Sequence, residues 1–294
     1  MTQPTDLAAK PLRKNVRYPV VAGRFYPADP NQLRERVWAF MGGQEQDSLT
    51  TLLAMVPHAG YEYSGAVAGG TLGRSNLAET VVLLGPNHTG RGKPVAVWPG
   101  GEWHTPLGPV PVDAELAECL VGTDAVFAPD MAAHMAEHSL EVVLPFLQER
   151  RPGLRIVPIA VAVPSPEELA RCGAALARCM ARYSFMGRSV SLVVSSDMSH
   201  YVPQDEARRL DHMALAAIRA LDPEALYSVV REQGITMCGV FPMTVAMVAC
   251  RLLGARAAEL TGYATSGDVS GETDRVVGYA GALVRAVPDD AAGE

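Results

Sequence analysis

The sequence predicts a single α/β domain in which a mixed central β-sheet is covered by helices on both faces. Short apolar runs alternate with longer helical patterns along most of the 294 residues, which is the order typical of α/β proteins. The chain contains no internal repeat and no linker long enough to separate two domains. We therefore expect one domain at residues 17–286, with an N-terminal tail at 1–16 and a C-terminal tail at 287–294.

Each strand is predicted from a short apolar run that ends at turn-forming residues. In chain order the predicted strands are 52–56, 80–84, 94–98, 154–162, 189–194, 257–263 and 276–284. Each helix is predicted from apolar residues that recur with a period of 3.6, as Leu140, Leu144 and Leu147 do. The predicted helices are 31–40, 65–72, 114–120, 138–148, 166–182, 205–221, 223–233 and 242–253. Pro166 and Pro242 fit the first turns of two of them.

The composition excludes several classes of function. The formal net charge is −7 and the basic residues are scattered, which argues against nucleic-acid binding. No stretch approaches the roughly 18 apolar residues of a membrane span, and the N-terminus has no apolar signal core. Five cysteines without a C-x-x-C pair argue against a disulfide framework. We therefore expect a cytoplasmic protein that binds neither membrane nor nucleic acid.

Polar turns that contain histidine follow three of the predicted strands. The run 52–56 is followed by "PHAGYEYSG", the run 80–84 by "GPNHTG" and the run 189–194 by "SSDMSHY". In open α/β sheets, side chains beyond the carboxyl ends of the strands converge on one crevice, where ligands bind. We therefore expect His58, His88, Asp197 and His200 to lie at one site.

Cys238 is a candidate third ligand for a metal at this site. It lies in "GITMCGVFP", just before the predicted helix 242–253, where free amides and the helix dipole favour a thiolate. One thiolate with two neutral imidazoles, from His58 and His88, could hold iron(II), copper(I) or zinc and leave a position open. The alternative is an inert, half-buried thiol, and the spacing alone does not decide between them.

The remaining histidines and cysteines have simpler interpretations. His104 and His212 are expected to be surface or satisfied core residues. His134 and His138 are four apart, a spacing that can bind metal on one helical face, but without an H-E-x-x-H pattern a supporting role is favoured. Four cysteines lie in Ala- or Leu-rich helical patterns and are expected in the core: Cys119, Cys172, Cys179 and Cys250.

Taken together, these stretches resemble the MEMO family, also called AmmeMemoRadiSam system protein B. The motifs of that family read here, in family order, as "VPHAGYEYSG", "LGPNHTG", "EHSLEVVLPFLQ", "SSDMSHY" and "CGVFP". The early "AGRFYP" and the late "GYATSGDVSG" also fit. The resemblance covers nearly the whole chain, from Val20 to Val284.

The resemblance implies a fold like that of the class III (LigB-type) extradiol dioxygenases. It also implies a metal site made by His58, His88 and Cys238, with Asp197 and His200 beside it. Members of the family have been linked to redox-active iron or copper, and to phosphopeptide binding by a signalling adaptor. The family name records an association with an AMMECR-type protein and a radical SAM protein, which are therefore the implied partners.

The sequence departs from related proteins at two positions. The dioxygenases bind iron(II) through two histidines and a carboxylate, whereas Cys238 stands where that carboxylate is expected. A thiolate changes the charge, the redox potential and the preference of the metal, and so weakens the case for ring-cleaving oxygen chemistry. His104, in "WHTPLG", stands where many relatives carry arginine. If that position contacts an anionic group of a ligand, recognition differs here.

Two functions fit this combination of residues. The first is a non-haem, dioxygenase-like oxidoreductase acting on a small aromatic or phenolic substrate, with iron(II) as the expected metal and copper or zinc as alternatives. His200, oriented by Asp197, would then be the general acid or base, because histidine titrates near neutral pH. The residues expected to contact the substrate are Tyr61, Tyr63, Asn87 and His138. The second function is a non-enzymatic module that binds a metal, a small molecule or a peptide in the same cleft and works with AMMECR-type and radical SAM proteins.

Overall fold

The computed structural model of the chain describes residues 15–43, 45–162 and 165–286. Most of the predicted N-terminal tail and the whole C-terminal tail at 287–294 lie outside these ranges. The last two residues of the predicted N-terminal tail pair with another strand. Glu102 donates its backbone N–H to the carbonyl of Asn15, and Val16 lies opposite Glu102 in a short parallel ladder. Within the described residues, no helix is both long and apolar enough to cross a membrane.

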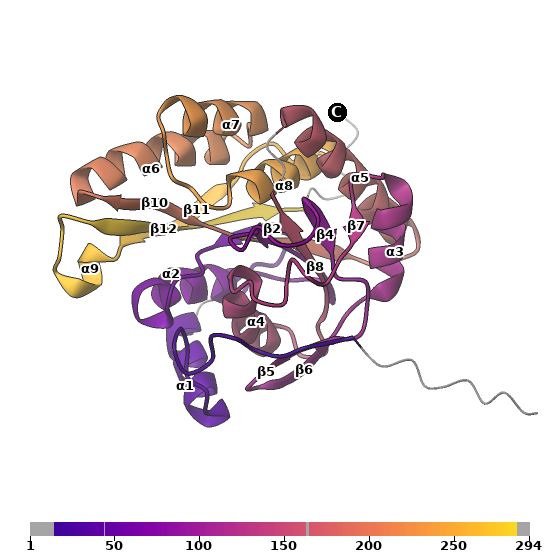
Figure 1. Ribbon diagram of the computed structural model, residues 1–294, viewed down its shortest axis with the longest axis horizontal. Helices are drawn as coiled ribbons and strands as arrows, with labels where there is room; N and C mark the ends of the chain where they lie inside the picture. The colour runs from indigo at the N-terminus through magenta and orange to yellow at the C-terminus, as the bar shows by residue number, and fades with distance from the viewer. Residues whose placement is uncertain (1–14, 44, 163–164, 287–294) are drawn as a thin grey trace, which may run out of the picture.

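A mixed β-sheet runs through the centre of the molecule (Figure 1). Among the described residues it has nine strands, in the order β10-β12-β2-β9-β3-β8-β4-β7, with β11 also paired to β12. The four central strands β2, β9, β3 and β8 are parallel, while β12, β10 and β11 pair antiparallel at one side. Their bounds are β2 (Thr51–Val56), β3 (Thr80–Pro86), β4 (Val95–Val97), β7 (Ala128–Pro129), β8 (Arg155–Val161), β9 (Val190–Ser195), β10 (Asp197–Val202), β11 (Glu259–Thr265) and β12 (Val276–Arg285).

Helices cover both faces of this sheet, because its central strands carry apolar side chains on both sides. Leu53 and Met55 pack into one apolar cluster, while the alternate residues Ala54 and Val56 pack into another. The first cluster is closed by α3 (Ala114–Thr123), α5 (Pro166–Phe185), α6 (Gln204–Arg219), α7 (Pro223–Glu232) and α8 (Val240–Leu252). The second is closed by α1 (Pro30–Met41), α2 (Tyr61–Arg74) and α4 (Ser139–Arg150). A short helix, α9 (Gly267–Ser270), precedes β12. The predicted fold class is therefore confirmed.

A small second sheet was not predicted from the sequence. It consists of β1 (Val16–Arg17), β5 (Glu102–Thr105) and β6 (Gly108–Pro111). These strands are only two to four residues long, too short for an alternating apolar pattern to stand out.

The buried Glu141 of α4 fastens the N-terminal segment to the rest of the fold. Its carboxylate accepts hydrogen bonds from the Arg17 guanidinium, the Tyr26 hydroxyl, and the backbone N–H groups of Val20 and Val21. A buried carboxylate is tolerated when it is paired and hydrogen-bonded in this way.

Within "SSDMSHY", the residues from Asp197 onward belong to strand β10, whereas the sequence predicted a turn there. The residues of β10 pair antiparallel with β12, with register shifts between Asp197 and His200 and between His200 and Val202. The segment contains no apolar alternation, and the free edge of β12, distant in the sequence, supplies its pairing partners. The turn before α2 is also shorter than predicted, since the helix begins at Tyr61 rather than at residue 65.

Candidate metal centre

His58 follows β2 and presents one unprotonated ring nitrogen at the carboxyl edge of the sheet. Its Nδ1 lies 2.6 Å from Oγ of Ser195, whose hydroxyl donates to the carbonyl of Ser139. Because that hydroxyl proton is already used, Ser195 accepts the Nδ1 proton, and Nε2 of His58 keeps a free lone pair. Burial, together with the nearby His88 and His138, holds the pKa of His58 well below its usual value, so the ring is neutral at pH 7.

His88 follows β3 and is held in the same tautomer by a carboxylate. Its Nδ1 lies 2.9 Å from Oε1 of Glu137, and its backbone N–H donates to Oε2. Glu137 is buried and also accepts the N–H groups of His138 and Ser139. Burial alone would raise the pKa of Glu137, but these hydrogen bonds and the two neighbouring histidines lower it to about 2. The Nε2 atom of His88 is therefore left as the free nitrogen.

Cys238 lies just before α8, with its sulfur beside His58. Its Sγ is 3.5 Å from Nε2 of His58 and accepts the backbone N–H of Asp197 at 3.2 Å. Burial, followed by the charge of Asp197, raises the pKa of the Cys238 thiol. The thiol is consequently protonated unless a cation is bound, since a coordinated metal deprotonates a thiol.

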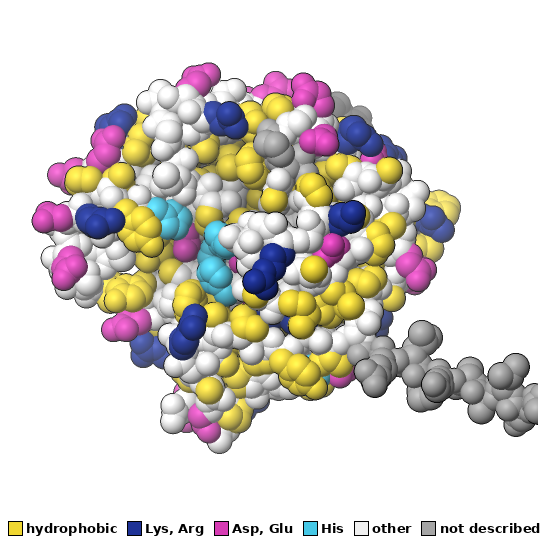
Figure 2. Space-filling model, viewed as in Figure 1, with side chains coloured by type: hydrophobic (Ala, Val, Ile, Leu, Met, Phe, Trp, Pro, Cys, Tyr) yellow, Lys and Arg dark blue, Asp and Glu magenta, His cyan; other side chains and the backbone are white. Residues whose placement is uncertain are grey.

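These three side chains bring one donor atom each to a common point. The ligand atoms of His58, His88 and Cys238 all lie within 4.8 Å of one another. A second set that meets the same criterion consists of His88, Glu137 and His138. Figure 2 shows histidine side chains (cyan) gathered on one face of the molecule, with an acidic side chain between them. Two imidazoles that can each offer an unprotonated Nε2 atom and one thiol form a donor set that suits iron(II), copper(I) or zinc.

Asp197 and His200 lie beside this cluster, but they are not joined to each other as expected. Oδ1 of Asp197 accepts the backbone N–H of His58 at 2.8 Å, so the aspartate holds the turn that carries His58. His200 is oriented by Thr236 instead: its Nδ1 lies 3.0 Å from the Thr236 carbonyl, and its backbone N–H donates to the Thr236 hydroxyl. Nδ1 of His200 therefore carries the proton, and Nε2 is free to accept one.

The residues expected to contact a substrate have different environments. His138 stacks on His88 at a ring distance of 5.0 Å and is 28% exposed, so it forms part of the histidine cluster. Tyr63 is 39% exposed on the first turn of α2. Asn87 caps its own loop, since its Oδ1 accepts from Thr89 and its Nδ2 donates to the carbonyl of Arg91.

Tyr61 has a core position rather than a place in the wall of the site. It is buried, its hydroxyl donates to the Val142 carbonyl, and its ring contacts Tyr26 and Phe146. The assignment of Tyr61 to substrate contact is therefore corrected to a packing role. The tyrosine enters the core because α2 begins at this residue, which turns its side chain toward α4.

The other histidines lie away from the cluster. His104, on β5, pairs with Glu102 and packs against Tyr18. His212 contacts the Arg208 carbonyl and the ring of Tyr263. His134 is buried between Trp98 and Trp103, outside the group of ring contacts that joins His58, His88 and His138.

Sequence reasoning did not identify Glu137 and Ser195 as supports for the two histidines. Glu137 directly precedes His138 in the "EHSLE" motif, but its partner His88 is 49 residues away. Ser195 opens the "SSD" motif, but it is 137 residues from His58. The only sequence signal for these two supports was an acidic residue or a serine within a site motif. Such residues are common at strand ends, so the signal is too weak to predict the contacts.

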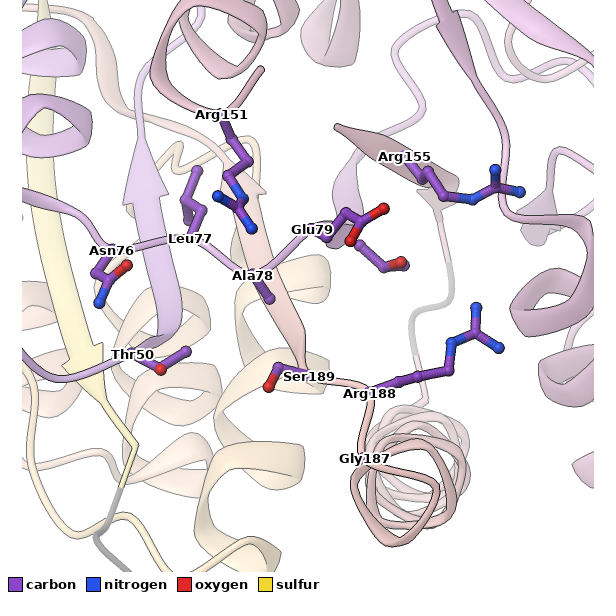
Figure 3. Close-up of a pocket in the computed structure, with 11 residues that line it drawn as sticks. Thr50, Asn76, Leu77, Ala78, Glu79, Arg151, Arg155, Gly187, Arg188 and Ser189 are labelled. Carbon is purple, nitrogen blue, oxygen red and sulfur yellow. The ribbon is translucent and has the colours of Figure 1, made fainter. Parts of the chain in front are cut away.

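A different cavity, of about 370 Å³, lies at the opposite edge of the sheet (Figure 3). It is lined by residues at the amino ends of β2, β3, β8 and β9, among them Arg151, Arg155 and Arg188. Arg155 and Arg188 pair with Asp113, and Arg188 also pairs with Glu115. Because these carboxylates offset two of the arginine charges, the cavity is a weak candidate for binding an anion.

Comparison with known proteins identifies relatives over nearly the whole chain. A family model described as "Memo-like protein" matches residues 17–283. A MEMO1 family protein of Methanopyrus kandleri is 42% identical over 282 residues, which is 92% of this chain and 99% of that protein. A MEMO1 family protein of Aquifex aeolicus is 41% identical over 269 residues, or 91% and 98% of the two chains. Among solved structures, an uncharacterized protein from Escherichia coli K12 aligns with a TM-score of 0.49 and 14% identity over 77% of this chain and 98% of that chain.

Proposed function

The chain belongs to the MEMO family, and we propose that it is a cytoplasmic, metal-dependent oxidoreductase whose metal is held by His58, His88 and Cys238. The observation that carries the proposal is the convergence of their three ligand atoms within 4.8 Å. Hydrogen bonds leave Nε2 free on both rings, which is the form that a metal requires. Iron(II) is the metal we expect, with copper or zinc as alternatives, because sulfur and imidazole ligands suit these ions.

The protein residues around the metal would bind a small substrate and move a proton. A bound iron or copper ion would supply the redox chemistry and act as a Lewis acid. His200 would act as general base through Nε2, since its Nδ1 proton is engaged by the Thr236 carbonyl. His88 and His138, which are 34% and 28% exposed, leave the site reachable from solvent. A small phenolic or otherwise aromatic molecule fits this setting, because it can stack on the imidazole rings and offer a proton to His200.

The test is metal analysis of protein purified without oxygen, followed by oxygen-uptake assays against a panel of catechols. Alanine substitution of His58, His88 or Cys238 should each lower the metal content. The matched controls His104→Ala and His212→Ala should keep it, because both histidines lie away from the cluster. Equal loss of metal from all five variants would contradict the assignment.

Substitution of His200 distinguishes an enzyme from a protein that only binds metal. The His200→Ala variant should retain its metal and lose roughly 10²–10⁴-fold in turnover, the usual contribution of a proton-transfer group. If His200→Ala empties the site, His200 is itself a ligand. If the wild-type protein binds metal but turns over none of the panel, the non-enzymatic alternative is favoured, in which the cleft binds a small molecule or peptide alongside AMMECR-type and radical SAM partners.

A further inference from the structure

Two cysteines that play no part in the metal centre have their sulfur atoms in contact. Cys119 lies on α3 and Cys179 on α5, helices that pack side by side (Figure 1). Their Sγ atoms are 2.7 Å apart. A disulfide joins two sulfur atoms about 2.05 Å apart, so these two sulfurs have only a short distance to close.

The hydroxyl of Thr123 determines which acceptor each thiol proton has. It donates to the carbonyl of Cys119 at 2.6 Å, so its oxygen is available to accept the proton of Cys179 at 3.2 Å. The Cys119 thiol in turn donates to the sulfur of Cys179. Each thiol proton therefore has an acceptor, and the Cys179 sulfur faces Cys119 directly.

Only one of the two cysteines is partly exposed to solvent. Cys119 is partly exposed and lines a surface cavity of about 270 Å³, whereas Cys179 is buried. The other residues that line this cavity are Glu115, Glu118, Arg182 and Tyr183. A small disulfide can therefore reach Cys119 from solvent, and Cys179 is in place to attack from behind it. Exposure of this kind distinguishes reactive cysteines from structural ones.

We propose that Cys119 and Cys179 form a redox-convertible dithiol that exchanges with low-molecular-weight disulfides such as glutathione disulfide. The thiolate of Cys119 attacks one sulfur of glutathione disulfide, the disulfide bond breaks, and one glutathione leaves and takes up a proton. The sulfur of Cys179 then loses its proton and attacks Sγ of Cys119, which releases the second glutathione. In total the two protein thiols lose two electrons and two protons, and the glutathione disulfide gains them as two glutathione thiols.

The reactivity of Cys179 should increase once Cys119 has reacted. Burial raises the pKa of Cys179 to about 12, so its thiol stays protonated in the reduced protein. Conversion of Cys119 to a mixed disulfide places a disulfide sulfur directly beside Cys179, which makes the second attack intramolecular. The buried thiol therefore remains inert in the reduced protein and becomes the resolving group when its neighbour is modified.

The test exposes the metal-loaded full chain to glutathione buffers of increasing oxidised fraction, followed by acid quenching, thiol tagging and peptide mass spectrometry. A cross-link between the peptides of Cys119 and Cys179, lighter by two hydrogen atoms, should form in proportion to the oxidised fraction and disappear on reduction. Because the two residues are 60 positions apart in the sequence, the bond closes a long loop, and the oxidised protein should have a higher thermal midpoint.

Variants resolve the order of the two steps. Cys179→Ser should accumulate a glutathione adduct at Cys119, whereas Cys119→Ser should show no adduct at the buried position 179. The control Cys172→Ser, which changes another buried cysteine of α5, should behave like the wild type. Absence of the cross-link at every buffer ratio in the wild type would overturn the proposal. So would cross-links that involve Cys172 or Cys250 in equal yield, because they would show that the protein must unfold before it is oxidised.

Discussion

Two imidazole rings at the carboxyl edge of the sheet are held in the same tautomer by different partners. Ser195 accepts the Nδ1 proton of His58, and Glu137 accepts that of His88. A neutral serine leaves the buried ring uncharged, whereas the carboxylate of Glu137 outweighs the effect of burial and raises the pKa of His88. The two rings therefore differ in basicity although both can present Nε2. A carboxylate behind a ligating histidine increases the basicity of the ligand.

Glu137 should control metal affinity without contacting the metal. Glu137→Gln keeps the size of the side chain but replaces one acceptor oxygen with an NH₂ group. Oε1 contacts Nδ1 of His88 and the N–H groups at the start of α4, and Oε2 accepts the backbone N–H of His88, so the NH₂ group would face one of these donors. We expect metal affinity to fall about 10–100-fold, measured by competition with a chromophoric chelator. Glu35→Gln, on the exposed side of α1, is the control. Unchanged affinity in Glu137→Gln would contradict the positioning role.

His134 should make the stability of the protein sensitive to acid. Burial lowers its pKa to about 4, whereas a histidine in the unfolded chain titrates near 6.5. Between these values the unfolded state binds more protons than the folded state, so stability is complete above pH 6.5 and declines as the pH falls toward 4. The contribution is about 3 kcal/mol at 1.36 kcal/mol for each pKa unit.

Chemical denaturation at pH 7 and pH 4 measures this effect. His134→Phe cannot be protonated, so it should lose about 3 kcal/mol less than the wild type between the two pH values. His212→Ala, which changes an exposed histidine, should lose as much as the wild type. Equal acid sensitivity in His134→Phe and the wild type would assign the loss to other groups.

At the scale of elements, α1 and α2 meet at glycines that leave room for Phe40. A Cβ atom on Gly69 would lie 2.5 Å from Cβ of Phe40 and 2.6 Å from its backbone carbon, whereas a Cβ atom on Gly70 would meet nothing within 4 Å. Gly69→Ala should therefore destabilise the protein by about 1–3 kcal/mol through overpacking. Gly70→Ala should stabilise it by up to about 1 kcal/mol, because alanine is the better helix former. Urea denaturation of both variants is the measurement. Equal changes in stability for the two variants would show that α1 shifts to accommodate the added methyl group at little cost.

The long apolar elements could be predicted from the sequence, and the short or polar ones could not. Strands β2 and β3 are buried along their full lengths, so their apolar runs stand out. Strand β10 carries "DMSHYV", and its pairing with β12 is a long-range contact that a local pattern does not contain. The same limit applies to the site. The positions of His58 and His88 after neighbouring strands predicted that both lie at one edge of the sheet. The contact between Glu137 and His88 became visible only in the structure. That these histidines bind a metal stays a prediction.

At the scale of the whole molecule, three chemically distinct features lie in separate places. The histidine cluster follows the carboxyl ends of β2 and β3, the arginine-lined cavity lies at the amino ends of the same strands, and the cysteine pair lies in the helical layer of α3 and α5. Glu115 lines the cavity beside Cys119 and pairs with Arg188 of the arginine-lined cavity. The histidine cluster shares no residue with either, so a substitution there is expected to leave the cysteine pair intact. Metal occupancy and thiol oxidation can therefore be measured independently on one preparation.

A metal bound by His58, His88 and Cys238 should stabilise the entire fold, because these residues come from distant parts of the chain. His58 follows β2, His88 follows β3, and Cys238, 180 residues after His58, precedes α8. The unfolded chain does not hold these groups together, so the ion binds the folded state in preference. Free metal at about 1,000-fold above its dissociation constant would add about 4 kcal/mol to the free energy of unfolding. We expect the thermal midpoint to fall by several degrees when a chelator removes the metal. His104→Ala should show the same decrease, whereas Cys238→Ser should start at the lower midpoint and respond little to the chelator. A midpoint that is the same with and without metal in the wild type would show that the ion does not bridge these three elements.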